Sequence, residues 1–164
     1  MQDFLTLAWT TRQPILQTIS PASLVASTLV KTLGERAADY AYVDFASGAG
    51  GPTPSIERKL NKALAVISNG QAPPAKFVLT DLHPHVEAWK AAAKKSENLS
   101  YVAEGVDAAN APTDLLKNVN GIETDKKIMR LFSLSFHHFD DELAAKILDN
   151  TLENADGFWY VYLT

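Results

Sequence analysis

A glycine-rich turn with an acid in front of it is the segment of this sequence best suited to chemistry. In the stretch YVDFASGAGGPTPSIERKL, Asp44 closes a short apolar run, and Gly48, Gly50 and Gly51 follow it. Glycine lets the backbone approach a ligand closely or adopt a positive φ. A helix opening at Thr53–Pro54 would add unpaired N–H groups. The pattern predicts a ligand site, although a tight strand-to-helix turn would also account for the glycines.

The turn departs from two common phosphate-binding motifs. A P-loop needs a lysine and a hydroxyl residue after its last glycine, and no lysine lies near this turn. The dinucleotide motif G-x-G-x-x-G/A, counted from Gly48, places Thr53 where a glycine or alanine is needed. Pro52 and Pro54 also stiffen the approach. Both phosphate ligands are therefore disfavoured.

Acids also stand at the ends of the next two expected strands. Asp81 lies at the end of the apolar segment at 76–82, and Asp107 ends the segment at 99–107. Parallel strands present their carboxyl ends at one edge of a sheet, so we expect Asp44, Asp81 and Asp107 to converge there. Simpler roles are open for each acid. Asp81 and Asp107 can cap helices, and Asp44 can hold the turn through backbone N–H groups.

S-adenosylmethionine, a ligand without phosphate, suits this set better. Its carboxylate and ribose would meet the glycine turn, and its ammonium would meet Asp44. Asp81 would accept hydrogen bonds from both ribose hydroxyls. Asp107, followed by the small Ala108, would border the adenine. The residues therefore favour S-adenosylmethionine as the cofactor.

Strands and helices are expected to alternate along the chain. Apolar, β-branched and aromatic runs predict strands at 41–46, 76–82, 99–107, 127–138 and 157–163. Helices are expected at 3–9, from Ser20–Pro21, from Thr53–Pro54 to Ile67, from Pro84, briefly after the loop DAANAPTDLLKN, and after Asp140–Asp141. Gly34 would either end the second of these helices or only interrupt it. The alternation predicts an α/β, Rossmann-like, doubly wound and mostly parallel sheet. Residues 1–39 would form a helical segment on the substrate side, and residues 40–164 the cofactor-binding domain.

Composition limits the classes of partner. The 164 residues suit one domain, and 46% hydrophobic residues suffice for one core. A net charge of −4 with scattered lysines argues against nucleic acid. The chain has no cysteine, which fits a reducing compartment. It also has no apolar run of membrane-spanning length and no pattern of a signal peptide. We therefore expect a cytoplasmic protein without nucleic-acid or membrane partners.

Four segments, in this order, resemble the motifs of class I S-adenosylmethionine-dependent methyltransferases. VDFASGAGG is similar to the family's D-x-G-x-G-x-G turn, with Ala46 at the first glycine position, which requires a negative φ there. TDLHP, which contains Leu82, is similar to the ribose motif, and EGVDAANAP to the adenine-side motif. LFSLSFHHFDD, which contains Ser135, resembles the fourth motif of the small-molecule enzymes. More narrowly, the set resembles fungal methyltransferase-like proteins. The resemblance adds Ala46, Leu82 and Ser135 to the expected cofactor contacts.

The resemblance implies methyl transfer to a small, aromatic or polyketide-like acceptor by in-line displacement. Alignment of the reactants and exclusion of water would supply most of the catalysis. His138 or His137, after the fourth strand, is the candidate base for a hydroxyl acceptor. Alternatively the pair walls the pocket, or joins His83 and His85 around a metal. No complete ligand set is evident, and we expect no metal.

The family's sheet has seven strands in the order 3-2-1-4-5-7-6, whereas five are expected here. Residues 157–163 would then form an apolar, uncharged edge strand, of the kind that pairs with another chain. We therefore expect a homo- or hetero-oligomer formed through residues 157–164. A catalytically inactive binding or partner subunit of the same fold is the alternative to an enzyme.

Overall fold

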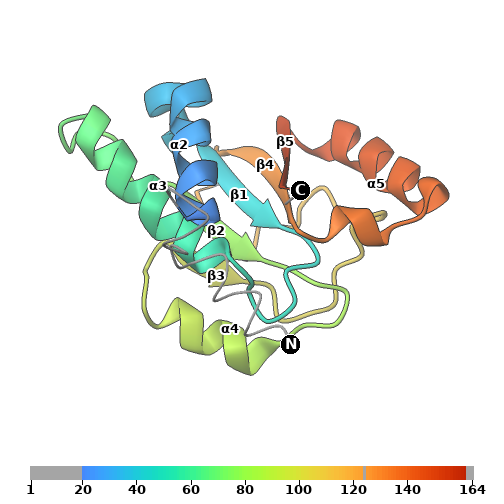
Figure 1. The fold of residues 1–164 in the computed structure, drawn as a ribbon. Coiled ribbons are helices and arrows are strands. Elements are labelled where there is room, and N and C mark those ends of the chain that lie inside the picture. Colours follow the sequence, from blue (N-terminus) through green and yellow to red (C-terminus); the bar gives the residue numbers. More distant parts are fainter. Residues whose placement is uncertain (1–19, 124, 162–164) are drawn as a thin grey trace.

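A five-stranded parallel sheet forms the centre of the molecule (Figure 1). The computed structural model describes residues 20–123 and 125–161. The strands are β1 (Tyr40–Asp44), β2 (Lys76–Leu79), β3 (Leu99–Tyr101), β4 (Lys127–Ser133) and β5 (Gly157–Val161). Their order is β3-β2-β1-β4-β5. The chain adds strands on one side of β1 and then on the other, which confirms the expected Rossmann-like, doubly wound fold.

Helices cover both faces of this sheet (Figure 1). They are α2 (Pro21–Leu33), α3 (Thr53–Ile67), α4 (Val86–Ala93) and α5 (Asp141–Asn154), with two short 3₁₀ helices at Gly34–Asp39 and Phe136–His138. One core contains apolar side chains of α2, α3 and α4, and the other contains Ile147 of α5. The helix expected at 3–9 lies outside the described residues. No described helix is long and apolar enough to cross a membrane.

The alternation of side chains along β1 separates the two cores. Tyr42 belongs to the core under α3, where its ring stacks on Phe77 with centroids 4.7 Å apart. Val43, the next residue, belongs to the opposite core, together with Phe45 and Phe132. A strand buried on both faces reads as a continuous apolar run, as this one does. The single acid in β1, Asp44, is therefore carried into the interior.

The helix ends follow their local sequence signals. Ser20 caps α2, with its side chain accepting a hydrogen bond from the Ser23 amide at 3.3 Å. Gly34 ends that helix at φ 60°. Asp140 caps α5, accepting from the Leu143 amide at 2.8 Å. The expected caps at Ser20 and Asp140 are confirmed, and Gly34 ends α2 and does not merely interrupt it. The helix α4 begins at Val86, two residues after Pro84.

Four strands end earlier in the structure than the sequence predicts, and one expected helix does not form. β1, β2, β3 and β4 end at Asp44, Leu79, Tyr101 and Ser133, so each following motif lies in a loop. In the described part of 102–126, the chain makes successive turns where a short helix was expected. The Asp107 carboxylate accepts from the Ala109 amide at 2.9 Å, a local bond that competes with regular structure.

The buried hydroxyl of Tyr42 provides a test of the first core. It donates to the Ala37 carbonyl at 3.0 Å. Tyr42→Phe keeps the ring stack and leaves that carbonyl without its donor. We expect urea denaturation to show a loss of about 1–2 kcal/mol in the free energy of unfolding. The control Tyr40→Phe, at a more exposed tyrosine of the same strand, should change it by less than about 0.5 kcal/mol. Equal effects would contradict a specific role for this bond.

Candidate functional site

The loops after β1, β2 and β4 meet at the carboxyl edge of the sheet, at the point where the strand order reverses. Parallel pairing sets Asp44 of β1 beside Leu79 of β2 and Leu131 of β4. Beyond the strands, the Phe45 amide donates to the Leu131 carbonyl at 2.9 Å, and the Ser47 amide donates to the Thr80 carbonyl at 3.1 Å. Such reversal points are where open α/β sheets bind ligands.

Asp81 contacts the glycine turn directly. One carboxylate oxygen, Oδ2, accepts the Gly48 amide at 2.8 Å, and the other, Oδ1, accepts the His83 amide at 2.9 Å. Asp81 is half-buried and lies five residues before α4, so it does not cap that helix. The structure thus brings together the turn after β1 and the acid after β2.

Trp89 of α4 packs against the glycine turn and donates a hydrogen bond to it. Its indole Nε1 donates to the Gly48 carbonyl at 2.8 Å, and its side chain is fully buried. A Cβ built on Gly50 would lie 3.8 Å from the Trp89 ring and 3.5 Å from Leu79. The sequence did not predict this hydrogen bond to the turn. No local pattern signals a partner 41 residues away.

Four residues of the turn adopt positive φ, and one of them is not a glycine. Gly48, Gly50 and Gly51 have φ of 53°, 105° and 47°, as their type allows. Ala46 has φ 52°, so the negative φ that would make an alanine tolerable at this position is not observed. Leu134, just after β4, has φ 67°. Side chains in this region are strained, and such residues concentrate at functional sites.

Asp44 is a fully buried carboxyl beneath the turn. Its Oδ2 accepts from the Thr53 hydroxyl at 2.5 Å, while its Oδ1 has no hydrogen-bond partner. Burial raises the pKa of Asp44 to about 7, although the hydrogen bond from Thr53 and the polar groups of the neighbouring Ser133 oppose the shift. This carboxyl can be neutral or ionised near physiological pH. A cation beside the free oxygen would favour the ionised form.

The remaining expected cofactor residues take different positions. The Val106 amide donates to the Asp81 carbonyl at 2.8 Å, which holds the loop after β3 beside the site. Asp107 itself is exposed, and its side chain closes its own turn. Leu82 is 57% exposed. The buried Ser135 hydroxyl donates to the Phe45 carbonyl at 3.3 Å, which joins the loops after β4 and β1.

Gly105 is a site residue that the sequence reasoning missed. A Cβ built there would lie 2.7 Å from the Leu82 carbonyl oxygen. The loops after β2 and β3 thus pack backbone against backbone, which only glycine permits at this position. A glycine between the second and third acids was the one available signal.

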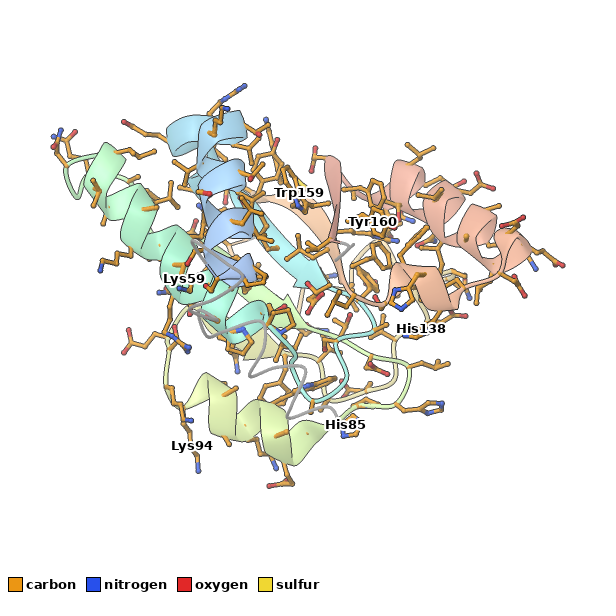
Figure 2. All side chains as sticks on the ribbon, viewed as in Figure 1. Lys59, His85, Lys94, His138, Trp159 and Tyr160 are labelled. Atoms are coloured by element: carbon orange, nitrogen blue, oxygen red, sulfur yellow. The ribbon has the colours of Figure 1, made fainter. Side chains whose placement is uncertain are left out.

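The histidines lie on two separate segments, after β2 and after β4. His137 and His138 occupy the short 3₁₀ helix Phe136–His138, with ring centroids 4.0 Å apart, and both are exposed. Figure 2 places His138 on the α5 side of the molecule and His85 on the α4 side. Among the described residues, no group of three His, Asp or Glu side chains could hold a metal.

No protein-family model matches the sequence, and no curated protein matches it.

The raised pKa of Asp44 predicts a specific dependence of stability on pH. The folded protein keeps a proton that the unfolded chain loses above pH 3.8, the ordinary pKa of this group. The contribution to stability is therefore complete below about pH 4 and is lost as pH rises towards 7. Relative to Asp44→Asn, we expect the wild type to lose on the order of 2–4 kcal/mol across this range. Denaturation of both proteins from pH 4 to 8 measures the difference, and parallel curves would contradict the prediction.

The positive φ of Ala46 predicts that a glycine fits better at this position. Ala46→Gly removes a backbone strain of about 1–2 kcal/mol and adds about 0.4–1 kcal/mol of unfolded-state entropy. We expect an unchanged or slightly higher stability, by up to about 1 kcal/mol, in thermal unfolding. Ala49→Gly, in the same turn at an ordinary φ, serves as the control and should lower stability. If both variants lose stability equally, the left-handed conformation of Ala46 is wrong.

Proposed function

We propose that this chain binds S-adenosylmethionine at the carboxyl edge of β1 and β2 and transfers its methyl group to a small-molecule acceptor. The observation that carries the proposal is the contact of the Asp81 carboxylate with the Gly48 amide. A ribose lying over the glycine turn would meet Asp81 at this point. Its two hydroxyls could take over the carboxylate oxygens that now accept the Gly48 and His83 amides.

The charges around the turn support this ligand over a phosphate. Asp44 and Asp81 are both acids, and the turn carries no lysine or arginine. A pyrophosphate would be repelled by these carboxylates, whereas an ammonium would be attracted. The unpartnered Oδ1 of buried Asp44 is an acceptor suited to the ammonium of the methionine tail.

The loop after β4 would form the acceptor side. Ser135 joins this loop to the loop after β1, so a donor over the glycine turn and an acceptor beside β4 would share one edge of the sheet. His137 and His138 are the side chains of this loop that can take a proton from a hydroxyl acceptor. The resemblance to fungal small-molecule methyltransferases makes an aromatic or polyketide-like molecule in the cytoplasm the favoured acceptor.

A second candidate is a cofactor-binding partner subunit without catalysis, and the outer strand favours it. β5 is at the edge of the sheet, as expected, and Phe158 and Tyr160 on it are 41% and 44% exposed. Figure 2 shows Trp159 and Tyr160 on opposite sides of this strand. Apolar edges of this kind pair with another chain. Homo- or hetero-oligomerisation through β5 would accompany this role.

Binding of S-adenosylhomocysteine, the demethylated product, tests the ribose assignment. We expect isothermal titration calorimetry to show binding to the wild type and an affinity at least about tenfold lower for Asp81→Ala, since one hydrogen bond to a charged group contributes about 1.5–3 kcal/mol. Asp140→Ala removes an acid that only caps α5, and it serves as the control. Unchanged affinity in Asp81→Ala would refute the ribose assignment, and no binding to the wild type would refute the cofactor.

A transfer assay separates the enzyme from the partner subunit. Isotope-labelled S-adenosylmethionine is incubated with a small-molecule extract, with and without the protein. Labelled product that falls in His138→Ala would support catalysis by this loop. Cofactor binding without any labelled product would favour the non-catalytic subunit.

A further inference from the structure

Arg130 is a buried cation on the opposite face of the sheet from Asp44. It is 2% exposed and forms no ion pair with any carboxylate of the described residues. Its guanidinium lies 4.7 Å from the centroid of the Phe45 ring. Nη2 donates to Asn150 Oδ1 at 2.8 Å, and Nη1 donates to Thr151 Oγ1 at 3.1 Å. Both of these partners lie on α5.

The side chains of Arg130 and Asn150 also donate hydrogen bonds to the loop after β3. Arg130 Nη1 donates to the Ala108 carbonyl at 3.4 Å, and Asn150 Nδ2 donates to the Ala111 carbonyl at 3.4 Å. The loop has its own turn bond, from the Asn110 amide to the Asp107 carbonyl at 3.1 Å. Its connection to the second core consists of these two donors, the buried Ala111, and the partly buried Ala108 and Ala109.

An arginine at this position needs a physical reason. Burying a charge without an opposite charge is costly, and an apolar residue would fill the same space more cheaply. Only arginine offers a planar fork that can reach a helix and a loop together. In the described part of 102–126, no helix packs the crossover from β3 to β4 onto the sheet. Instead, the guanidinium of Arg130 joins α5 to the backbone of the segment that carries Asp107 and Ala108.

We propose that Arg130, oriented by Asn150, is a positioning residue that fixes the 107–111 loop and thereby sets selectivity for the base of the bound nucleoside. This inference rests on the proposed function, in which Asp107 and Ala108 border the adenine. Discrimination of adenine from hypoxanthine depends on one exocyclic group and one ring nitrogen. The groups that read them must therefore be held within a fraction of an ångström.

The experiment compares Asn150→Ala and Arg130→Lys with the control Asn154→Ala. Asn154 lies one turn further along α5. Its side-chain Nδ2 donates to the backbone carbonyl of Asn150 within the helix. Hydrogen exchange of the ligand-free protein should show faster exchange of the 107–111 amides in the first two variants and no change in the control. Calorimetry with S-adenosylhomocysteine and S-inosylhomocysteine should show a preference for adenine in the wild type and the control. That preference should fall at least fivefold in the two test variants.

The outcomes separate the anchor, the selectivity and the cofactor. Unchanged exchange in both test variants would overturn the anchoring by Arg130. Faster exchange with an unchanged base preference would overturn the selectivity role. A wild type that binds neither nucleoside would overturn the proposed function and the selectivity with it, and the exchange data would still decide the anchor.

Discussion

The hydrogen bond between the Gly48 amide and the Asp81 carboxylate depends on the parallel register of β1 and β2. That register sets Asp44 opposite Leu79, so Asp81 begins the loop two residues further on, within reach of the turn. A slip of one residue would reverse which side chains enter each core, and Tyr42 would leave its stack on Phe77. The packing of the two cores therefore fixes the position of the acid at the site.

Two kinds of feature at the site, a buried carboxyl and left-handed backbone at residues other than glycine, cost free energy. Asp44 is buried with an unpartnered oxygen, and Ala46 and Leu134 hold positive φ without being glycines. Each feature costs free energy that the cores must offset. All three lie on the two sides of the reversal point between β1 and β4. A ligand that supplied a positive charge to Asp44 would recover part of this free energy.

The central strands carry opposite charges on their two faces. Asp44 of β1 points under the glycine turn, whereas Arg130 of β4 pairs with Val43 and enters the second core. One charge would act on the ligand, and the other holds a loop that would border it. Because the fold alone hosts many activities, the functional proposal depends on these side chains and not on the sheet.

Local sequence patterns determined the elements and most of their ends. The apolar runs predicted the five strands, and the caps at Ser20 and Asp140 were correct, because these signals act over a few residues. Local spacing also failed where the Asp107 side chain formed a turn in place of a longer strand and a following helix. The sequence also predicted the glycine turn and the order of the acids that follow the strands.

The tertiary structure alone decided what these residues touch. Gly48 forms hydrogen bonds with Asp81, 33 residues away in the chain, and with Trp89, 41 residues away. Gly105 packs against the Leu82 carbonyl, where a Cβ would not fit. The left-handed backbone of Ala46 likewise follows from where its loop must join neighbouring strands. Hydrogen-bond partners, burial and backbone strain depend on distances between segments remote in the chain. Periodicity carries no information about those distances, because it records only which face of its own element a residue occupies.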